Sequence, residues 1–423
     1  MKKLLVVCLG LLLVAGIAFA TGKQESAKEP QTVRWIAFQH TWINAIKPFL
    51  PEFEAETGIK LQFESYTDEQ QSQKLAVESA AGSPTLDVFG IRPLQDMLQF
   101  EKNGWLELLA SYADADKAFD VKDFPGVYLD ACSVKGKLVG IPILPEVAFL
   151  YYNKEMLAAK GLKVPTTLDE LWAAAEKLTD KSREIYGYGS RGQRSAAVTQ
   201  FSPFLYGSGG DWIVNGKATI DTPVAIKAFR FYGDILRNFG PPNVVSMSWA
   251  GIADLFNQGK VAMAIEGSSQ YGTVVDPAKS KVWDKVGVAM APAGTAGSKP
   301  YSIVAWELCI GKSSANKKAA WKLISWLTSR KNMERTQQAG SFMARKSAWE
   351  KPENNTKFTP EFIAVNKKSA EIGKPYDRPV MIKVQQARDV IGVVIQVAIE
   401  GGDVEKAARE AQVQFQALLD AEK

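Results

Sequence analysis

Short apolar runs alternate with stretches of helical periodicity at the start of the chain. Apolar and β-branched runs at 32–38, 59–66 and 86–89 predict three strands, and apolar residues at helical spacing within 43–53 and 70–81 predict the helices between them. Two prolines, Pro48 and Pro51, must kink the first of these helices or delay its start. The resulting β-α-β-α-β order predicts an α/β fold with a mainly parallel sheet and helices on both faces.

The carboxyl ends of these predicted strands give the first candidate binding residues. Ligands of open α/β sheets bind outside the carboxyl ends of the strands. The polar side chains at those positions are Gln39, His40, Tyr66 and Arg92.

A second stretch, at 133–171, combines a turn, two apolar runs and a helix start. The turn contains Lys135 and Gly136, and the apolar runs lead into Pro142 and then from Val147 to Tyr152. Downstream, Thr167 and Glu170 stand at capping-box spacing ahead of an apolar helical stripe.

This stretch and several later segments follow one another in a familiar order. They are a GK-L-x-G-I-P strand followed by YYNK and PTTLDEL within 133–171, a GG-x-W turn and hairpin at 207–223, an F-x-x-G-K-x-A-M segment at 256–263, a strand with a Gly/Pro loop at 286–297, and a strand and helix at 302–327. In this order they resemble the extracellular solute-binding proteins of bacterial ABC importers, in the maltose-binding-protein-like branch that takes up sugars and polyols. The resemblance covers nearly the whole chain and is looser after residue 342.

The resemblance implies a two-lobed periplasmic-binding-protein fold in which a hinge joins the lobes and each lobe has a mainly parallel sheet flanked by helices. Residues 31–144 with 300–345 would form the N-terminal lobe, and 147–298 with 350–423 the C-terminal lobe. It further implies a monomeric receptor without catalytic activity, cofactor or metal. Such a receptor captures a carbohydrate or polyol in the cleft between the lobes by hinge closure and delivers it to the permease subunits in the membrane.

A site for such a ligand needs carboxylate acceptors, Arg or amide donors, and aromatic planes. The resemblance places a sugar-binding glutamate at Glu146 and turns the strand that ends at Glu266 toward the ligand. Further candidates for the site are Trp249, Trp306, Arg345, Tyr376 and Arg378. All of these candidates except Tyr376 have a structural alternative: the tryptophans as core residues, the carboxylates as surface groups, and the two arginines as braces of the hinge.

The first 30 residues read as a targeting segment. Lys2 and Lys3 precede an apolar stretch at 4–17 and an A-x-A site at 18–20, which is typical of a cleaved signal peptide spanning 1–20. Residues 21–30 are polar and form a flexible tether. No second long apolar run follows, so we expect export to the periplasm or the cell exterior, without a membrane span.

Composition narrows the alternatives. The chain has 423 residues, 46% of them apolar, which is enough for two globular domains. A net charge of +5 without a clustered basic stripe argues against nucleic-acid binding, and one histidine leaves little room for a zinc site. Cys132 and Cys309 lie in apolar surroundings and are interpreted as buried thiols, although export would allow them to pair.

Three other functions were weighed. The segment 187–192 matches G-x-G-x-x-G, but polar residues precede it, so a dinucleotide site is not expected. A secreted glycoside hydrolase using Glu146 and Glu266 stays open as an alternative. So does a binding protein for a phosphorylated polyol that uses Arg92, Arg345 and Arg378. The sequence does not name the ligand.

Overall fold

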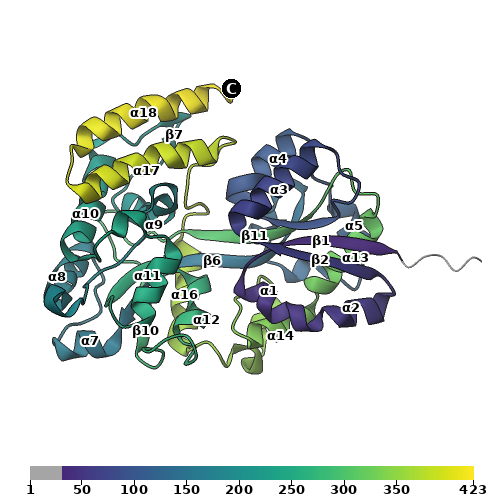
Figure 1. The fold of residues 1–423 in the computed structure, drawn as a ribbon, viewed down its shortest axis with the longest axis horizontal. Helices are drawn as coiled ribbons and strands as arrows, with labels where there is room; N and C mark the ends of the chain where they lie inside the picture. The colour runs from purple at the N-terminus through teal and green to yellow at the C-terminus, as the bar shows by residue number, and fades with distance from the viewer. Residues whose placement is uncertain (1–30) are drawn as a thin grey trace, which may run out of the picture.

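The computed structural model describes residues 31–423, so the predicted signal peptide and tether lie outside the described residues. Two bodies are joined side by side by the long strands β6 (Gly140–Asn153) and β11 (Ser302–Ile310) (Figure 1). A seven-stranded sheet runs through both bodies in the order β10-β6-β11-β3-β1-β2, with β9 also paired to β6.

The first body is built on the predicted opening. Its strands β1 (Thr32–Phe38), β2 (Lys60–Tyr66) and β3 (Val88–Ile91) pair in parallel, and β11 joins β3 antiparallel. Its helical segments are α1 (Thr41–Ile46), η1 (Lys47–Phe49), α2 (Leu50–Thr57), α3 (Asp68–Ala80), η2 (Pro93–Met97), α4 (Leu98–Lys102), α5 (Ala110–Ala115), η3 (Val121–Asp123), α6 (Gly126–Ala131), α13 (Lys317–Leu327), α14 (Arg330–Gln338) and α15 (Lys346–Glu350).

The prolines act as expected on the first helix. Pro48 and Pro51 fall near the starts of η1 and α2, so the predicted single helix is three short pieces. Gly58 ends α2 in the left-handed conformation with φ of 70°, which glycine adopts without strain.

The second body carries a different kind of sheet. Strands β9 (Met263–Gly267) and β10 (Val286–Met290) both pair antiparallel to β6, and parallel pairing is limited to isolated bridges such as Tyr186 with Val261. The α/β fold is confirmed, while the parallel ladder belongs to the first body.

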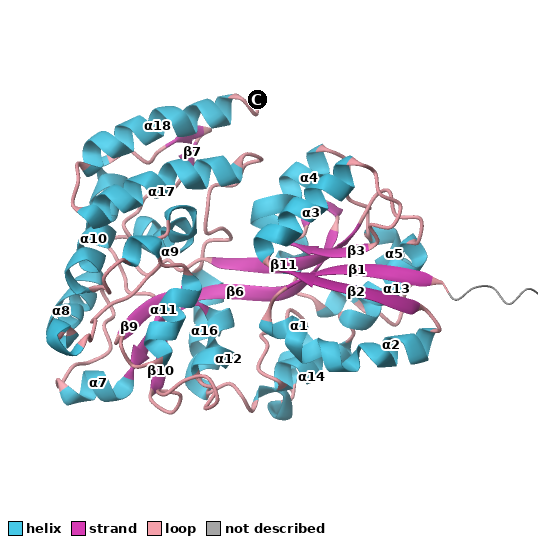
Figure 2. Cartoon of the chain, in the orientation of Figure 1, coloured by secondary structure: helices cyan, strands magenta, loops and turns pink. Residues whose placement is uncertain are grey.

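Helices cover this second sheet and extend from it (Figure 2). They are α7 (Lys154–Ala159), α8 (Leu168–Leu178), η4 (Lys181–Arg183), α9 (Arg194–Gly207), α10 (Pro223–Phe239), η5 (Val244–Ser246), α11 (Trp249–Asn257), η6 (Ser268–Gln270), α12 (Tyr271–Val274), α16 (Pro360–Ile372), α17 (Val384–Glu400) and α18 (Val404–Asp420), while η7 (Pro352–Asn355) packs on α14 and α15 of the first body. The short ladders are β4 (Ser133–Val134) with β5 (Lys137–Leu138) and β7 (Ile213–Val214) with β8 (Lys217–Ala218). The predicted capping box of Thr167 and Glu170 opens α8.

Each body has its own hydrophobic core. One core runs from Val147 to Phe415 and packs α9, α10, α17 and α18 together. The other body is packed around two adjoining clusters, which include Trp35 and Leu323 in one and Phe89 in the other. Cys132 and Cys309 are buried with free thiols. Across residues 31–423, no helix is both long and apolar enough to cross a membrane.

Candidate functional site

A group of buried and partly buried polar side chains lies in the second body where β6 and β11 enter it. We call it the junction cluster, and its members are Glu146, Arg191, Gln200, Glu266, Ser269 and Tyr301. They come from β6, from the loop before α9, from α9 itself, from β9, from η6 and from the residue just before β11. Segments distant in the sequence therefore meet at the place where the two bodies join.

Glu266 is the centre of this cluster. Arg191 Nε donates to its Oε2 at 2.9 Å, while Arg191 Nη2 and Gln200 Nε2 both contact Oε1. The backbone N–H of Gly267 adds a further bond to Oε1 at 3.0 Å. Burial disfavours the charged form of Arg191, but Glu266 more than offsets this effect and raises the pKa of the guanidinium. The guanidinium of Arg191 is thus charged and firmly oriented.

The cluster has hydrogen-bonding capacity that the protein does not fill. Gln200 Nε2 also donates to Tyr301 Oη at 3.2 Å, but the buried Oε1 of Gln200 has no partner among the described residues. Buried polar atoms are nearly always paired, so the unpaired amide oxygen sets Gln200 apart from most buried polar side chains of the protein.

Glu146 is the second carboxyl of the cluster and is only weakly held. The one hydrogen bond shown for it in the described chain comes from Ser269 Oγ at 3.1 Å. Burial raises the pKa of Glu146 to about 7, and Arg191 acts in the opposite direction. Its Oε1 lies so close to Gly267 that a Cβ added there would be 1.4 Å away, so only glycine leaves room for this carboxyl.

Asp377 and Arg378 form a second ion pair beside the cluster. Arg378 donates through Nε and Nη2 to the two oxygens of Asp377 at 2.6 and 2.5 Å, and Thr199 Oγ1 donates to Asp377 at 2.8 Å. Burial opposes ionisation of Asp377, but the positive charge of Arg378 outweighs it and the pKa is lowered. Arg378 Nη1 also reaches Gln95 of the first body, at 2.9 Å.

The candidates at the strand ends of the first body are held within that body. His40 Nδ1 accepts from the backbone N–H of Trp42 and caps α1, and burial lowers its pKa to about 4, so the ring is neutral. Tyr66 Oη donates to Glu64 at 2.7 Å. Gln39 is exposed, and its backbone N–H donates to the carbonyl of Tyr66.

Arg92 and Trp306 lie together in the same body. Arg92 donates to Asp96 at 3.4 Å and to Ser72 at 3.3 Å, and its guanidinium is 5.6 Å from the ring centre of Trp306. Phe38 stacks on Trp306 with 3.6 Å between ring centres, and Trp306 is 7% exposed. One face of this predicted stacking plane is therefore already covered.

Arg345 lies away from the junction cluster, in the core of the first body. It is 1% exposed and donates to the carbonyls of Phe119, Asp120 and Thr328 and to Asp123. These bonds use its donors, because the segments around it expose several backbone carbonyls to the core. In this structure Arg345 braces the core of the first body and makes no hydrogen bond to the junction cluster within residues 31–423.

The remaining two candidates are separate from the cluster. Tyr376 Oη donates to Asp211 at 2.7 Å and its ring packs edge-on against Tyr206. Trp249 begins α11 and is 47% exposed, and no hydrogen bond or ring contact links it to the cluster in residues 31–423.

Sequence reasoning missed several members of the cluster. Arg191 stands inside the glycine motif at 187–192, where the spacing gives no signal for the role of an arginine. A usable signal existed for Gln200, because α9 is buried from Ala197 to Gly207 and carries three polar residues in that span, namely Thr199, Gln200 and Ser202. Asp377 adjoins the predicted Arg378.

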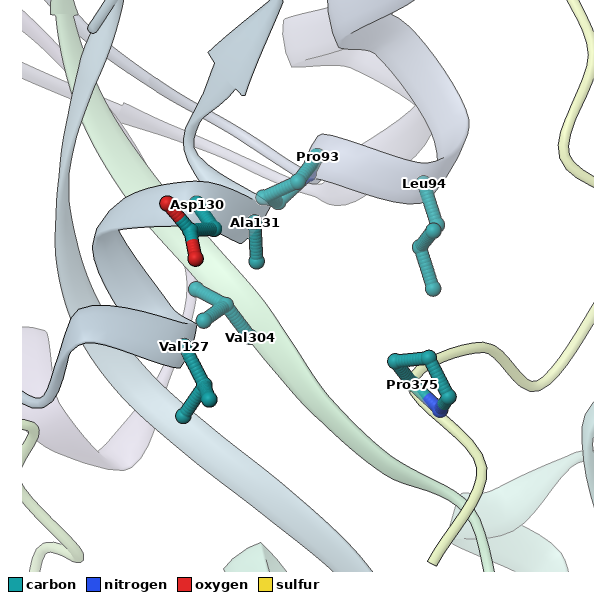
Figure 3. A pocket seen from close by; sticks show the side chains of 7 residues that line it. All are labelled: Pro93, Leu94, Val127, Asp130, Ala131, Val304 and Pro375. Atoms are coloured by element: carbon teal, nitrogen blue, oxygen red, sulfur yellow. The ribbon is translucent and has the colours of Figure 1, made fainter. Parts of the chain in front are cut away.

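A cavity of about 280 Å³ lies between the bodies beside β11 (Figure 3). Both bodies line it with mostly apolar side chains, which are Pro93, Leu94, Val127, Asp130, Ala131, Val304 and Pro375. No group of three or more potential metal-binding side chains was found within residues 31–423.

Comparison with known proteins gives a consistent picture. Residues 41–334 match the family model described as bacterial extracellular solute-binding protein. A putative binding protein of Brucella abortus is 31% identical over 281 residues, and the mannitol-binding protein of Pseudomonas aeruginosa is 29% identical over 294 residues. Each alignment covers 65% of this chain and, respectively, 66% and 64% of the relative, just under two thirds of its length.

Solved structures match over most of the chain. A solute-binding protein of Agrobacterium radiobacter in complex with ribitol superposes with a TM-score of 0.83 at 29% identity, covering 92% of this chain and 98% of that one. A solute-binding protein of Thermotoga lettingae bound with α-D-tagatose gives 0.82 at 25% identity, with 92% and 100% covered.

Proposed function

Since the chain belongs to the bacterial extracellular solute-binding protein family, we propose that it is the receptor of an ABC-type importer and binds a carbohydrate or polyol. The observation that carries the proposal is the unfilled hydrogen-bonding capacity of the junction cluster. A buried amide oxygen without a partner and a carboxyl with a single one lie where the two bodies meet.

Hydroxyl groups suit this cluster because each one both donates and accepts. A ligand hydroxyl that donates to Glu146 would accept from a neighbouring guanidinium, and a second would donate to the free oxygen of Gln200. Relatives and neighbours support this ligand class, since their names and bound molecules include mannitol, erythritol, ribitol and tagatose.

The two bodies are proposed to be the lobes of the receptor, with 31–144 and 300–345 in one and 147–298 and 350–423 in the other. In this proposal β6 and β11 form the hinge, and ligand closes the cleft because it contacts both lobes only in the closed form. The closed receptor, exported to the periplasm or cell exterior as a monomer, then delivers its ligand to the permease subunits.

No catalytic step is part of the proposal. Both oxygens of Glu266 are engaged by Arg191, which leaves it unsuited to act as a nucleophile opposite Glu146. Nor do the three arginines of the phosphate alternative come together, since Arg345 is in the core of the first body.

The test is a thermal-shift and calorimetry screen of ligand-free protein starting at Thr21. The panel contains ribitol, mannitol, tagatose, maltose and the phosphorylated polyols. Ligand at one hundred times its Kd stabilises the folded state by about 2.7 kcal/mol, which raises the melting midpoint visibly. We expect one neutral class to bind stoichiometrically and to be recovered intact. Silence across the panel, or turnover of chromogenic glycosides, would contradict the proposal.

A further inference from the structure

One side chain of the first body makes three hydrogen bonds to the second. Gln95 belongs to η2, and its Oε1 accepts from Arg378 Nη1 and from Arg388 Nη1, each at 2.9 Å. Its Nε2 donates to Gln385 Oε1 at 3.1 Å. These partners lie 283 to 293 residues further along the chain, in or just before α17.

The segment that carries Gln95 is fixed within its own body. The carboxylate of Asp96 accepts from the backbone N–H of Arg92 at 3.1 Å, which closes the turn where η2 begins. The neighbouring Leu94 packs against the core of the second body. Two consecutive residues of η2 therefore contact the other body, one through apolar surface and one through hydrogen bonds.

In the second body, the partners of Gln95 are themselves bonded to polar groups near the junction cluster. Arg378 pairs with Asp377 and donates to Thr199 on α9, the helix that also carries Gln200. Arg388 is 7% exposed, and its Nε donates to the carbonyl of Ser195 at the start of the same helix. The amide of Gln95 thus meets two guanidinium groups whose positions depend on the wall of the proposed cleft.

We propose that Gln95 is a positioning residue that holds the two bodies in their closed arrangement. All three of its interbody bonds are broken when the bodies separate, whereas its anchorage in η2 is kept. Hydrogen bonds to charged groups are stronger than neutral ones, so two guanidinium donors on one oxygen favour the closed form. Gln95 therefore raises ligand affinity through the fraction of closed molecules. This inference rests on the proposed function, because it assigns one residue to hinge closure.

The experiment measures the distance between the bodies without any ligand. Spin labels are placed on V77C in α3 and V413C in α18, two positions that are 70% and 72% exposed and lie in different bodies (Figure 1). The native Cys132 and Cys309 are buried, so the labels go to the introduced cysteines.

Three variants are compared in this background. Gln95→Ala removes the bonds, Gln95→Glu keeps an acceptor for both arginines, and Gln99→Ala is the matched control, because Gln99 is exposed on the adjoining α4 and no hydrogen bond of its side chain is shown. We expect the distance between the labels to increase in Gln95→Ala only, while the melting midpoint of this variant stays equal to that of the control. In Gln95→Glu the distance should equal the wild-type distance or be shorter. Ribitol or mannitol, whichever binds the wild type, should bind Gln95→Ala about tenfold more weakly.

Unchanged distances in Gln95→Ala would overturn the inference. A lower melting midpoint without a change in distance would also overturn it, since it would assign Gln95 a purely structural role. If neither polyol binds the wild type, the proposed ligand class is at fault, and the distance comparison still decides the role of Gln95.

Discussion

Two arginine–carboxylate groups in this molecule look alike but differ in how completely their hydrogen-bonding atoms are paired. Arg345 donates to three backbone carbonyls and to Asp123, and Asp123 accepts in addition from the N–H and the hydroxyl of Ser347. The group lies inside the core of one body and is complete without any other molecule.

The junction cluster is also buried, yet it is incomplete. Arg191 and Glu266 satisfy each other, but Gln200 keeps a free oxygen and Glu146 has one weak partner. The cluster lies in the second body, at the place where β6 and β11 enter it from the first. A buried charge thus does not by itself mark a binding site, and the unmet hydrogen-bonding capacity of the junction cluster is what supports our proposal of a ligand there.

The largest effect on stability is expected from removing Arg345, whose hydrogen-bonding group is fully paired. Arg345→Met leaves Asp123 and three carbonyls without their donor, so the free energy of unfolding should fall by about 3–5 kcal/mol. Urea denaturation at low temperature measures it. Lys346→Met is the control, because Lys346 is exposed, and it should stay within about 0.5 kcal/mol of wild type. The folded fraction of Arg345→Met should keep wild-type affinity, and a loss of affinity would return Arg345 to the site.

The next effect comes from the matching change in the junction cluster. Arg191→Met should weaken binding of the ligand found by the screen about 100-fold, or about 2.7 kcal/mol, because a guanidinium donor to the ligand is lost and Glu266 is reoriented. Calorimetry measures it, with the exposed Arg194→Met as control. Stability should fall less than in Arg345→Met, since Gln200 and the N–H of Gly267 still hold Glu266. Unchanged affinity with a large loss of stability would mean that Arg191, like Arg345, has only a structural role.

Local patterns in the sequence predict some strands of the fold correctly and miss the continuity of another. The strand predicted at 32–38 is β1, and the one predicted at 59–66 is β2 within one residue, because local apolar patterns decide these elements. The two apolar runs around Pro142 and Pro145 are instead one strand, β6. Its continuity comes from pairing with β11 in one body and with β9 and β10 in the other, which no local pattern encodes.

The site was less accessible to prediction for a related reason. The resemblance to the solute-binding family indicates Glu146 and Glu266, and the structure brings both into the junction cluster. Arg191, Gln200 and Tyr301 come from a loop, a helix and the residue just before a strand, so only the tertiary fold brings them together. Arg345 was chosen for the chemistry of its side chain, but that chemistry serves a core as well as a ligand.

A third buried carboxyl, Glu307 in β11, has no arginine at all and sharpens the comparison. It is fully buried, and neither oxygen accepts from an N–H or O–H donor of residues 31–423. Burial raises its pKa from 4.5 to about 8, with the Cys132 thiol lowering it and Asp96 raising it to smaller extents. The folded protein therefore keeps this carboxyl protonated at neutral pH.

The sign of the pH effect follows from that shift. Since the folded pKa lies above the unfolded one, the contribution of Glu307 to stability is fully present below about 4.5 and is lost as pH rises to about 8. Wild-type stability should lose up to about 1.4 kcal/mol per pH unit from this group within that window. The free energy of unfolding, measured by urea denaturation, should fall less between pH 6.5 and 7.5 in Glu307→Gln than in the wild type. An equal fall in both proteins would mean that Glu307 is ionised in the fold.

The smallest effect is expected from a change in the charge of Glu146. This carboxyl has one hydroxyl partner and a nearby arginine, so it is less fully paired than Asp123 beside Arg345 and better paired than Glu307. Its pKa of about 7 makes the charge of the cluster depend on pH in the physiological range. An ionised carboxyl accepts a ligand hydroxyl more strongly than a protonated one, so affinity should rise up to about tenfold between pH 6 and 8. Calorimetry with the ligand from the screen should show this rise for the wild type and a flat, weaker profile for Glu146→Gln. A wild-type affinity that falls with pH would mean that the protonated acid donates to the ligand, and a flat one that Glu146 does not contact it. In either case the ionised carboxylate of Glu146 would not be an acceptor for the ligand, and the junction cluster would have lost its most distinctive difference from the group around Arg345.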